Sequence, residues 1–153
     1  MSVATFQGDA TRFGAVYERH VAEWLTDLGC TIVDRNHRHK SGIEFDILAL
    51  LPTGETIGVE CKASPDTATS PGMKRSDQRW KVMGLLHTLQ HWKLRTGEAV
   101  RYVLITSHMP EAGTPQRRIL DFAELVGDLQ IIVVPSPRSR PPETGAGEVE
   151  STT

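Results

Sequence analysis

The chain has 153 residues, of which 39% are apolar and 24% charged, and a formal net charge of −2. This length and apolar content suffice for one globular domain with a single core. The charge excludes nucleic-acid binding through overall positive charge, so any such binding needs a local basic patch. Two cysteines, Cys30 and Cys61, exclude a disulfide framework and a cysteine-built zinc site, and favour a reduced cytoplasmic protein. Neither a signal peptide nor a membrane helix is expected, because no suitable apolar run is present.

The first predicted element is an amphipathic helix that begins near Asp9, after a loose lead-in over residues 1–8. Asp9 or Thr11 would cap this helix and Gly29 would end it. Its apolar side chains form one stripe at helical spacing: Phe13, Val16, Tyr17, Val21, Trp24, Leu25 and Leu28. Glu18 lies at the flank of this stripe, where it can reach the edge of a sheet. Taken alone, Glu18 is more simply explained as an exposed helix glutamate.

A short strand is predicted over residues 30–33, and a basic run follows it. The cations of this run are Arg35, Arg38 and Lys40. Basic runs are usually solvated loops, but this one leads directly into an acidic strand, so its cations are also candidates for contacts with DNA phosphates. His37 and His39 are weaker candidates for metal ligands, because no further ligand lies nearby.

Two alternating strands joined by a tight turn come next. Ile43, Phe45, Ile47 and Ala49 are predicted on one face of the first strand, with Glu44, Asp46 and Leu48 on the other. Pro52-Thr53-Gly54 predicts a three-residue hairpin loop with Gly54 in the left-handed conformation. This loop sets the register, which places Leu48 opposite Gly58, Asp46 opposite Glu60, and Glu44 opposite Lys62. Glu44 either pairs with Lys62 or is an extra acid of the site.

The pairing of Asp46 with Glu60 is the most informative feature of this hairpin. Like charges directly opposite each other destabilise a sheet, so folding alone does not explain this pair. A divalent cation held between the two acids would explain it, because hard cations prefer carboxylate oxygens. Lys62, on the same face as Glu60, adds a positive charge beside the proposed metal. This layout is suited to binding a phosphodiester and activating a water against it.

After the hairpin, residues 65–75 are rich in Ser, Thr, Pro and Gly and predict a mobile connection that orders on DNA through Lys74 and Arg75. A helix is predicted over residues 76–96, with Ser76 as its cap and Gly97 beyond its end. Lys81 on this helix either contacts DNA or covers apolar surface with its stem. The inner face of the helix comprises Val82, Leu85, Leu86, Leu89 and Trp92. A histidine pair, His87 and His91, has metal-chelating spacing but no evident third ligand.

The remaining elements complete a sheet and its core. Residues 100–107 predict a buried parallel strand, 115–126 a helix and 129–135 a last strand. From residue 136 the composition predicts a disordered tail. The order of elements gives one α/β domain over residues 9–135, with a central mixed sheet flanked by helices. This αβββαβ order is that of the restriction-endonuclease-like fold.

Asp46 followed by Glu60-Cys61-Lys62 resembles the D…ExK signature of the PD-(D/E)xK nuclease superfamily. Within it, the chain looks most similar to small archaeal-type Holliday junction resolvases and related small bacterial proteins, since residues 14–18 match their G-x-x-x-E helix motif. The resemblance covers roughly residues 13–94. It implies a Mg²⁺-dependent DNA endonuclease, with Mn²⁺ as a possible substitute.

The resemblance also implies roles for individual residues. Asp46, Glu60 and the Cys61 carbonyl would bind the metal, and Lys62 would activate the attacking water or neutralise the phosphate. Glu18, at the site edge, would hold a metal-bound water or a second metal. Cys61 would point its thiol to the core. The enzyme would act as a homodimer on branched DNA in recombination or repair. Candidates for an exposed pairing surface are Trp80, Trp92 and Phe122.

Two alternatives remain. The first is a non-catalytic DNA-binding or assembly module that keeps the fold. The second is a restriction-type or recombination nuclease. Recombination exonucleases of the superfamily carry a Gln-x-x-x-Tyr helix, from which this chain departs because Val82 follows Gln78 at that spacing. A restriction enzyme usually needs a specificity domain, for which no chain is left.

Overall fold

The computed structural model describes residues 3–65 and 71–137, with side chains from Arg12 onward. Its elements are α1 (Val3–Asp27), β1 (Thr31–Arg38), β2 (Glu44–Leu50), β3 (Thr56–Lys62), the 3₁₀ helix η1 (Gly72–Lys74), α2 (Ser76–Thr96), β4 (Arg101–Thr106), α3 (Pro115–Val126) and β5 (Leu129–Val133). They form one α/β domain, as predicted. Of the predicted tail, residues 138–153 lie outside the described residues. No helix in the described ranges is long and apolar enough to cross a membrane.

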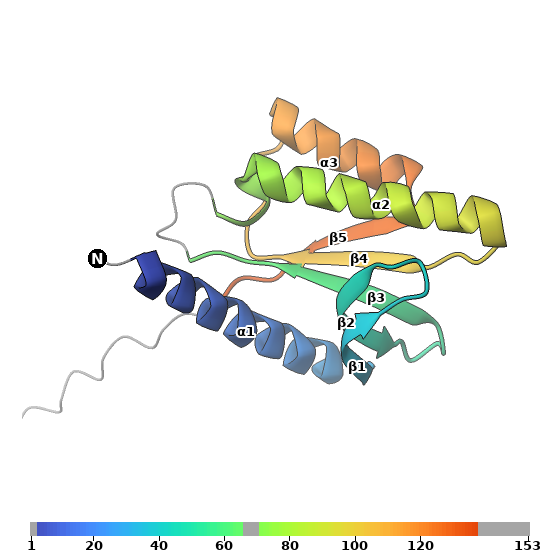
Figure 1. Ribbon diagram of the computed structural model, residues 1–153, viewed down its shortest axis with the longest axis horizontal. Coiled ribbons are helices and arrows are strands. Elements are labelled where there is room, and N and C mark those ends of the chain that lie inside the picture. The colour runs from blue at the N-terminus through green and yellow to red at the C-terminus, as the bar shows by residue number, and fades with distance from the viewer. Residues whose placement is uncertain (1–2, 66–70, 138–153) are drawn as a thin grey trace, which may run out of the picture.

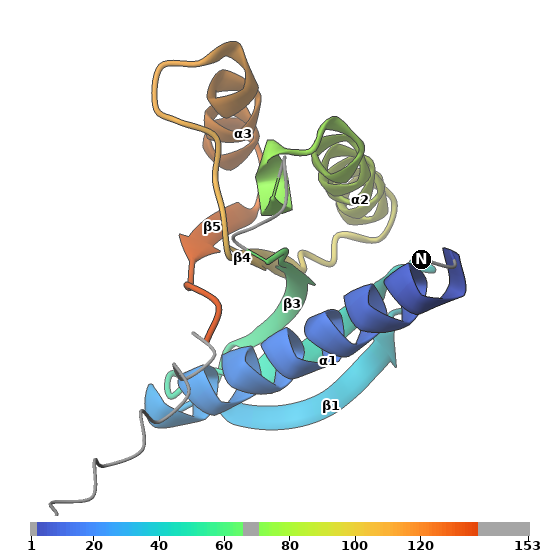
Figure 2. The same ribbon diagram turned by 90° about the vertical axis from the view of Figure 1, so that its left-hand side faces the viewer.

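A five-stranded mixed sheet in the order β1-β2-β3-β4-β5 forms the centre of the domain. β1, β2 and β3 are antiparallel neighbours, whereas β3, β4 and β5 run parallel, which agrees with the helical crossovers through α2 and α3. α1 lies on one face of the sheet, and α2 and α3 lie on the other (Figures 1 and 2). Because both faces are covered, the domain has two apolar cores, one against α1 and one against α2 and α3.

α1 is longer than its sequence predicts. It begins at Val3, so the expected lead-in over residues 3–8 is helical and Asp9 and Thr11 lie inside the helix. Its end is as predicted: Gly29 has a φ of 91°, its N–H donates to the Thr26 carbonyl, and the Cys30 N–H donates to the Leu25 carbonyl. This is the Schellman arrangement, which satisfies the last carbonyls of a helix. The apolar stripe is narrower than predicted, because the side chains of Val16 and Leu28 are exposed.

β1 includes part of the basic run that the sequence assigned to a loop. The strand extends to Arg38 because its backbone pairs with β2 as far as Glu44. A register shift between Ile32 and Asp34, and a φ of 50° at Asn36, bend it along the way. Such irregularities increase the local twist of a strand. The run is therefore fixed on the sheet beside α1.

The hairpin between β2 and β3 has the predicted register. Leu48 pairs with Gly58, the Leu51 N–H donates to the Glu55 carbonyl at 2.8 Å, and Gly54 has a φ of 90°. Paired residues end at Ile47 and Val59, one pair before Asp46 would meet Glu60. The hairpin therefore opens at the point where the two acids stand.

From Ile47 back toward Glu44, β2 separates from β3, and its buried side chains pass from one face of the sheet to the other. Ile47 and Ala49 pack in the core against α1, whereas Ile43 and Phe45 pack in the core against α2. The prediction of one common face for these four residues is therefore wrong. Gly58 allows the crossing, because a Cβ at this position would lie 2.6 Å from the Phe45 ring.

The connection to α2 includes a short helix, where the sequence predicts a mobile segment over residues 65–75; residues 66–70 of that segment lie outside the described residues. Residues 72–74 form η1, and the Met73 side chain is fully buried in the α2 core. Arg79 donates to the carbonyls of Met73 and Lys74, which holds η1 against α2. α2 has the predicted bounds and the left-handed Gly97 at its end. Its cap residue is Arg75, without a side-chain cap bond, so the capping role predicted for Ser76 is wrong.

Candidate active site

Where the hairpin opens, the Asp46 side chain accepts a hydrogen bond from a backbone N–H that the strand pairing no longer satisfies. Backbone-bonded pairs in an antiparallel ladder recur every second residue, so Phe45 and Cys61 would be the next such pair after Ile47 and Val59. Instead, Oδ2 of Asp46 accepts the Cys61 N–H at 2.7 Å. The carboxylate is thereby fixed against β3, next in sequence to Glu60.

Glu60 is a buried acid with 7% of its surface exposed. Its Oε1 lies 2.7 Å from Nζ of Lys62, and both side chains are largely withdrawn from solvent. Burial and the nearby charge of Asp46 raise the pKa of Glu60, whereas Lys62 lowers it. Burial also raises the pKa of Asp46, against the opposing effects of the Cys61 N–H and Lys62. Burial thus disfavours the charged forms of both acids, and Lys62 partly counteracts this effect.

Glu18 completes the acidic side of the site from α1. Burial and the charge of Asp46 raise its pKa, and Arg35 on β1 lowers it. The Arg35 guanidinium lies 3.7 Å from the Glu18 carboxylate. The structure therefore brings together Glu18, Asp46, Glu60 and Lys62, the four residues predicted to be catalytic. Arg35, predicted to contact DNA, forms an ion pair with Glu18 in the structure.

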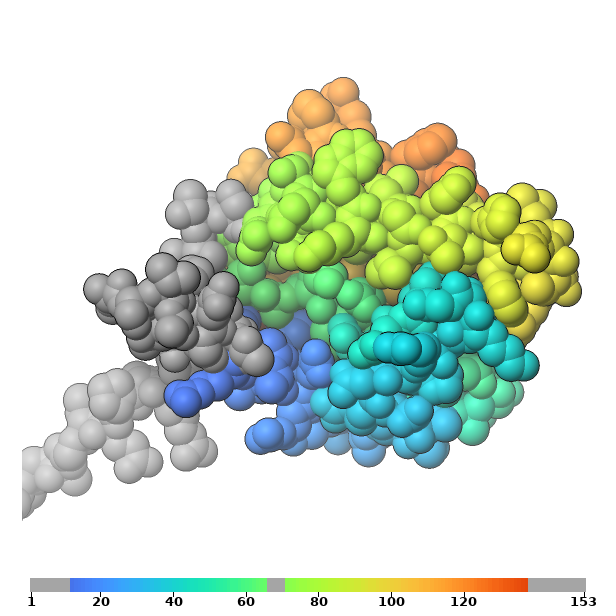
Figure 3. All heavy atoms as spheres, viewed as in Figure 1, coloured from blue at the N-terminus to red at the C-terminus, as the bar shows by residue number. Residues whose placement is uncertain are grey.

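A cavity of about 160 Å³ is lined by Glu18 and Lys62, whereas Asp46 and Glu60 are not among its lining residues. It is lined from α1 by Gly14, Tyr17 and Glu18, from β3 and the segment after it by Cys61, Lys62, Ala63 and Ser64, and from the α2 side by Gly72, Arg75 and Gln78. In Figure 3 a strip of darker green, from the chain that follows β3, separates the blue surface of α1 from the yellow-green surface of α2. The predicted lysine and helix glutamate thus share one opening to solvent.

The cavity includes polar residues that the sequence did not assign to the site. Gln78 lines it, and Oε1 of Gln78 is buried without a hydrogen-bond partner among the described residues. Ser64 also lines it and accepts the Gly72 N–H at 2.9 Å, while the Ser64 N–H donates to Ser107 at 3.1 Å. These bonds pin both ends of the connection that follows Lys62. The sequence feature that could have pointed to Gln78 is its position in the first turn of the helix that follows this connection.

The remaining predicted basic residues are spread over the surface. Arg38 faces Glu44 at 3.8 Å, so the predicted pairing of Glu44 with Lys62 is wrong because β2 has left β3. Arg75 lines the cavity and binds Asp77 through two hydrogen bonds of 3.0 and 2.8 Å. Lys40, Lys74 and Lys81 are exposed.

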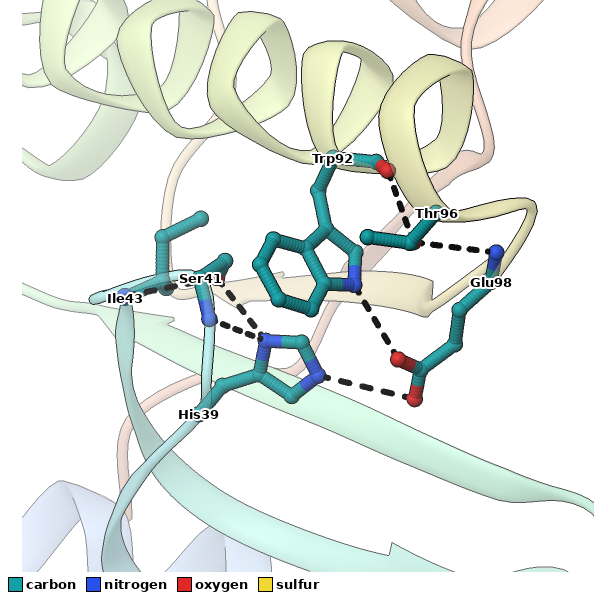
Figure 4. A network of polar contacts seen from close by, with 6 residues as sticks. All are labelled: His39, Ser41, Ile43, Trp92, Thr96 and Glu98. Carbon is teal, nitrogen blue, oxygen red and sulfur yellow. Dashed lines mark hydrogen bonds and ion pairs between the residues drawn. The ribbon is translucent and has the colours of Figure 1, made fainter.

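His39 belongs to a network of polar contacts that joins two parts of the fold. Its Nδ1 contacts Ser41, and its Nε2 lies 3.9 Å from Glu98, which also accepts the Trp92 indole N–H (Figure 4). This network ties the β1–β2 connection to the end of α2. His37 pairs with Asp34 at 2.9 Å.

The donor set near Asp46 suits a magnesium-like ion better than zinc. Within residues 12–65 and 71–137, no three His, Cys, Asp or Glu side chains gather as a metal-binding group. A structural zinc site would need such a group. Mg²⁺ is usually held by one or two carboxylates, with waters and substrate phosphates supplying the remaining ligands. Asp46 and Glu60 are two neighbouring carboxylates of the kind that this coordination requires. The Cys61 thiol is not a suitable ligand, because burial raises its pKa and it packs against the α1 core.

The family model of UPF0102, described as an uncharacterised protein family, matches residues 17–107, more than half of the chain. The chain belongs to UPF0102. This family lies in the restriction endonuclease-like superfamily, so the superfamily predicted from the acid and lysine motif is confirmed. The UPF0102 match spans Glu18, Asp46, Glu60 and Lys62. Among curated proteins and solved structures, no match was found.

Proposed function

We propose that this UPF0102 member is a metal-dependent DNA endonuclease that hydrolyses phosphodiester bonds. The observation that supports the proposal most is the Lys62 ammonium at 2.7 Å from buried Glu60, beside Asp46 and a cavity that Glu18 also lines. Acids and a lysine in this arrangement suit the binding of an anionic substrate and the activation of water.

Asp46, Glu60 and the Cys61 carbonyl would hold Mg²⁺, with Mn²⁺ as a substitute. The bound ion would act as a Lewis acid toward the phosphodiester. Its double positive charge would stabilise the charged forms of Asp46 and Glu60, which burial disfavours.

The protein's own groups would share the remaining work. In the structure the Lys62 ammonium forms an ion pair with Glu60, and a phosphodiester at the cavity would be a second anionic partner for Lys62. There Lys62 would stabilise charge on the phosphate or orient the attacking water. Glu18 would accept a hydrogen bond from a water at the cavity edge. Arg35 would favour the charged form of Glu18 that does so.

For the substrate, we propose a structure-specific, Holliday junction resolvase-like activity on branched DNA. Contacts with phosphates would come from a set of basic residues: Arg35, Arg38, Lys40, Lys74, Arg75 and Lys81. Symmetric cutting of two strands would require a homodimer. Trp80 and Phe122 are exposed by 67% and 59% and are available for pairing, whereas Trp92 is engaged in the His39 network.

The test is a cleavage assay in Mg²⁺ with labelled single strands, linear duplex, a flap and a four-way junction. We expect paired symmetric nicks in the junction. Asp46→Asn and Lys62→Met should each reduce cleavage by about 100-fold or more, because the first removes a charged ligand of the proposed metal ion and the second removes a positive charge that stabilises the phosphate. DNA binding measured in Ca²⁺ should persist in both variants.

Arg95→Ala, at the opposite end of α2 from the cavity, is the matched control and should cut at the wild-type rate. Wild-type cleavage by Asp46→Asn would refute the site. DNA binding without cleavage in Mg²⁺ or Mn²⁺ would instead favour a non-catalytic module of the same fold. Preference for linear duplex would refute the resolvase-like part only.

A further inference from the structure

The hydroxyl of Tyr102 is not explained by packing. Tyr102 is fully buried on β4, in the core between the sheet and the α2–α3 layer. In the part of the chain that the structure describes, its hydroxyl has no hydrogen-bond partner. Burying a hydroxyl without a partner is unfavourable, and phenylalanine would fill the same space without this cost. The buried members of the surrounding core cluster are otherwise apolar, so they offer no side-chain acceptor.

Glu60 is the acceptor that the sheet brings nearest in register. Tyr102 pairs with Gly58, and Leu104 pairs with Glu60, so Tyr102 and Glu60 lie on one face of two neighbouring strands, two residues apart. Side chains on the same face of neighbouring strands, offset by two residues, can approach each other when one is aromatic and the other long. Phe45 packs over Gly58 and lies 6.1 Å from the Tyr102 ring, centroid to centroid.

The charges of the site act on this hydroxyl. Burial raises the pKa of Tyr102 well above its ordinary value, and the charges of Glu60 and Asp46 raise it further. The phenol therefore keeps its proton and remains a hydrogen-bond donor. Glu60 is the one buried carboxylate among the described residues. In the structure its Oε1 is taken by Lys62 at 2.7 Å.

We propose that Tyr102 is a positioning residue for Glu60, and that its hydroxyl donates to the Glu60 carboxylate when Lys62 turns to an incoming phosphate. This inference rests on the proposed function, because it assigns a role within the same site. Without a second donor, the departure of Lys62 would leave the buried Glu60 carboxylate with no protein group to orient it toward the metal ion. The orphaned hydroxyl supplies that donor from within the core.

The test is Tyr102→Phe, with Leu120→Val as control. Leu120 is buried in the same core but belongs to α3, so its truncation loosens packing without removing a donor. Four quantities are measured for each variant: the Tm of metal-free protein, the affinity for Mn²⁺ with an uncleavable phosphorothioate DNA bound, and kcat and KM on the substrate that the wild type cuts best. The affinity comes from the EPR signal of the unbound ion, with the same DNA without protein as reference.

For Tyr102→Phe we expect an unchanged or higher Tm, an Mn²⁺ affinity lower by about tenfold, and a lower kcat with little change in KM. Loss of a group that orients a metal ligand typically costs 10–100-fold in affinity or activity. Leu120→Val should lower Tm and leave Mn²⁺ affinity unchanged. An affinity of Tyr102→Phe within about twofold of wild type, or equal losses in both variants, would overturn the inference. A wild type that binds no Mn²⁺ would overturn the proposed function, and this inference with it.

Discussion

Asp46 has two roles that substitution can separate, since it is an acid of the site and also the acceptor for the Cys61 N–H. Asparagine keeps an acceptor oxygen and removes the charge. Alanine removes both. The pKa of Asp46 is raised, mainly by burial, so the folded protein disfavours its charged form. In metal-free protein at pH 7, Asp46→Asn should therefore be at least as stable as wild type.

Asp46→Ala should be less stable than Asp46→Asn by about 1–3 kcal/mol, the cost of leaving a buried N–H unpaired. With a slope of about 2 kcal/mol per molar urea, this difference moves the unfolding midpoint by about 0.5–1.5 M. Tryptophan fluorescence in EDTA is a suitable assay.

The pH dependence gives an independent check. A raised folded-state pKa means that the folded protein binds more protons than the unfolded chain, so the destabilisation by this acid is fully present above the folded pKa. It is lost as pH falls toward the unfolded value of about 3.9. The advantage of Asp46→Asn should therefore shrink on acidification. Asp34→Asn should show the opposite sign at pH 7, because the hydrogen bond from His37 lowers the pKa of Asp34.

Two outcomes would refute this reasoning. One is an Asp46→Asn protein that is clearly less stable than wild type at pH 7. The other is equal stability of Asp46→Asn and Asp46→Ala, which would mean that the Cys61 N–H does not depend on this side chain.

Further predictions concern packing and the β1–β2 connection. Gly58→Ala should lower the free energy of unfolding by about 1–3 kcal/mol, because the added methyl meets the Phe45 ring. Gly84→Ala on α2, where nothing lies within 4 Å of the added Cβ, should instead stabilise the protein by about 0.5–1 kcal/mol in the same urea assay. Glu98→Ala removes the carboxylate that accepts the Trp92 indole N–H and lies 3.9 Å from His39, and should speed hydrogen exchange in residues 39–43. Global stability should change there by less than about 1 kcal/mol, and an unchanged exchange rate would contradict the anchoring role.

Local chemistry made much of this fold predictable. Pro52-Thr53-Gly54 predicts the hairpin and its register because a three-residue loop leaves few alternatives. Gly97 marks the end of α2 through its left-handed conformation. The facing of Asp46 and Glu60 in that register led to the site, because a pair of acids has no folding rationale there.

Other features depend on contacts that local patterns do not contain. Alternation alone does not tell where two strands separate, so the change of face between Phe45 and Ile47 was missed. The glycine at position 58, in mid-strand, is the trace of that crossing, since such glycines often mark a close approach. β1 extends beyond its apolar residues because β2 supplies its backbone partners. Gln78 enters the cavity through the docking of α2, which its own sequence does not specify.

The change of side along β2 has a consequence for how the proposed enzyme matures. Asp46 stands at the single step between a residue buried under α1 and one buried under α2, so its position is defined only when both layers have assembled. A nascent or partly unfolded chain with one layer in place would lack the aspartate in its working position. We therefore expect DNA cleavage to be the last property gained during folding and the first lost on partial unfolding. Incompletely folded molecules of the protein would then not cut DNA.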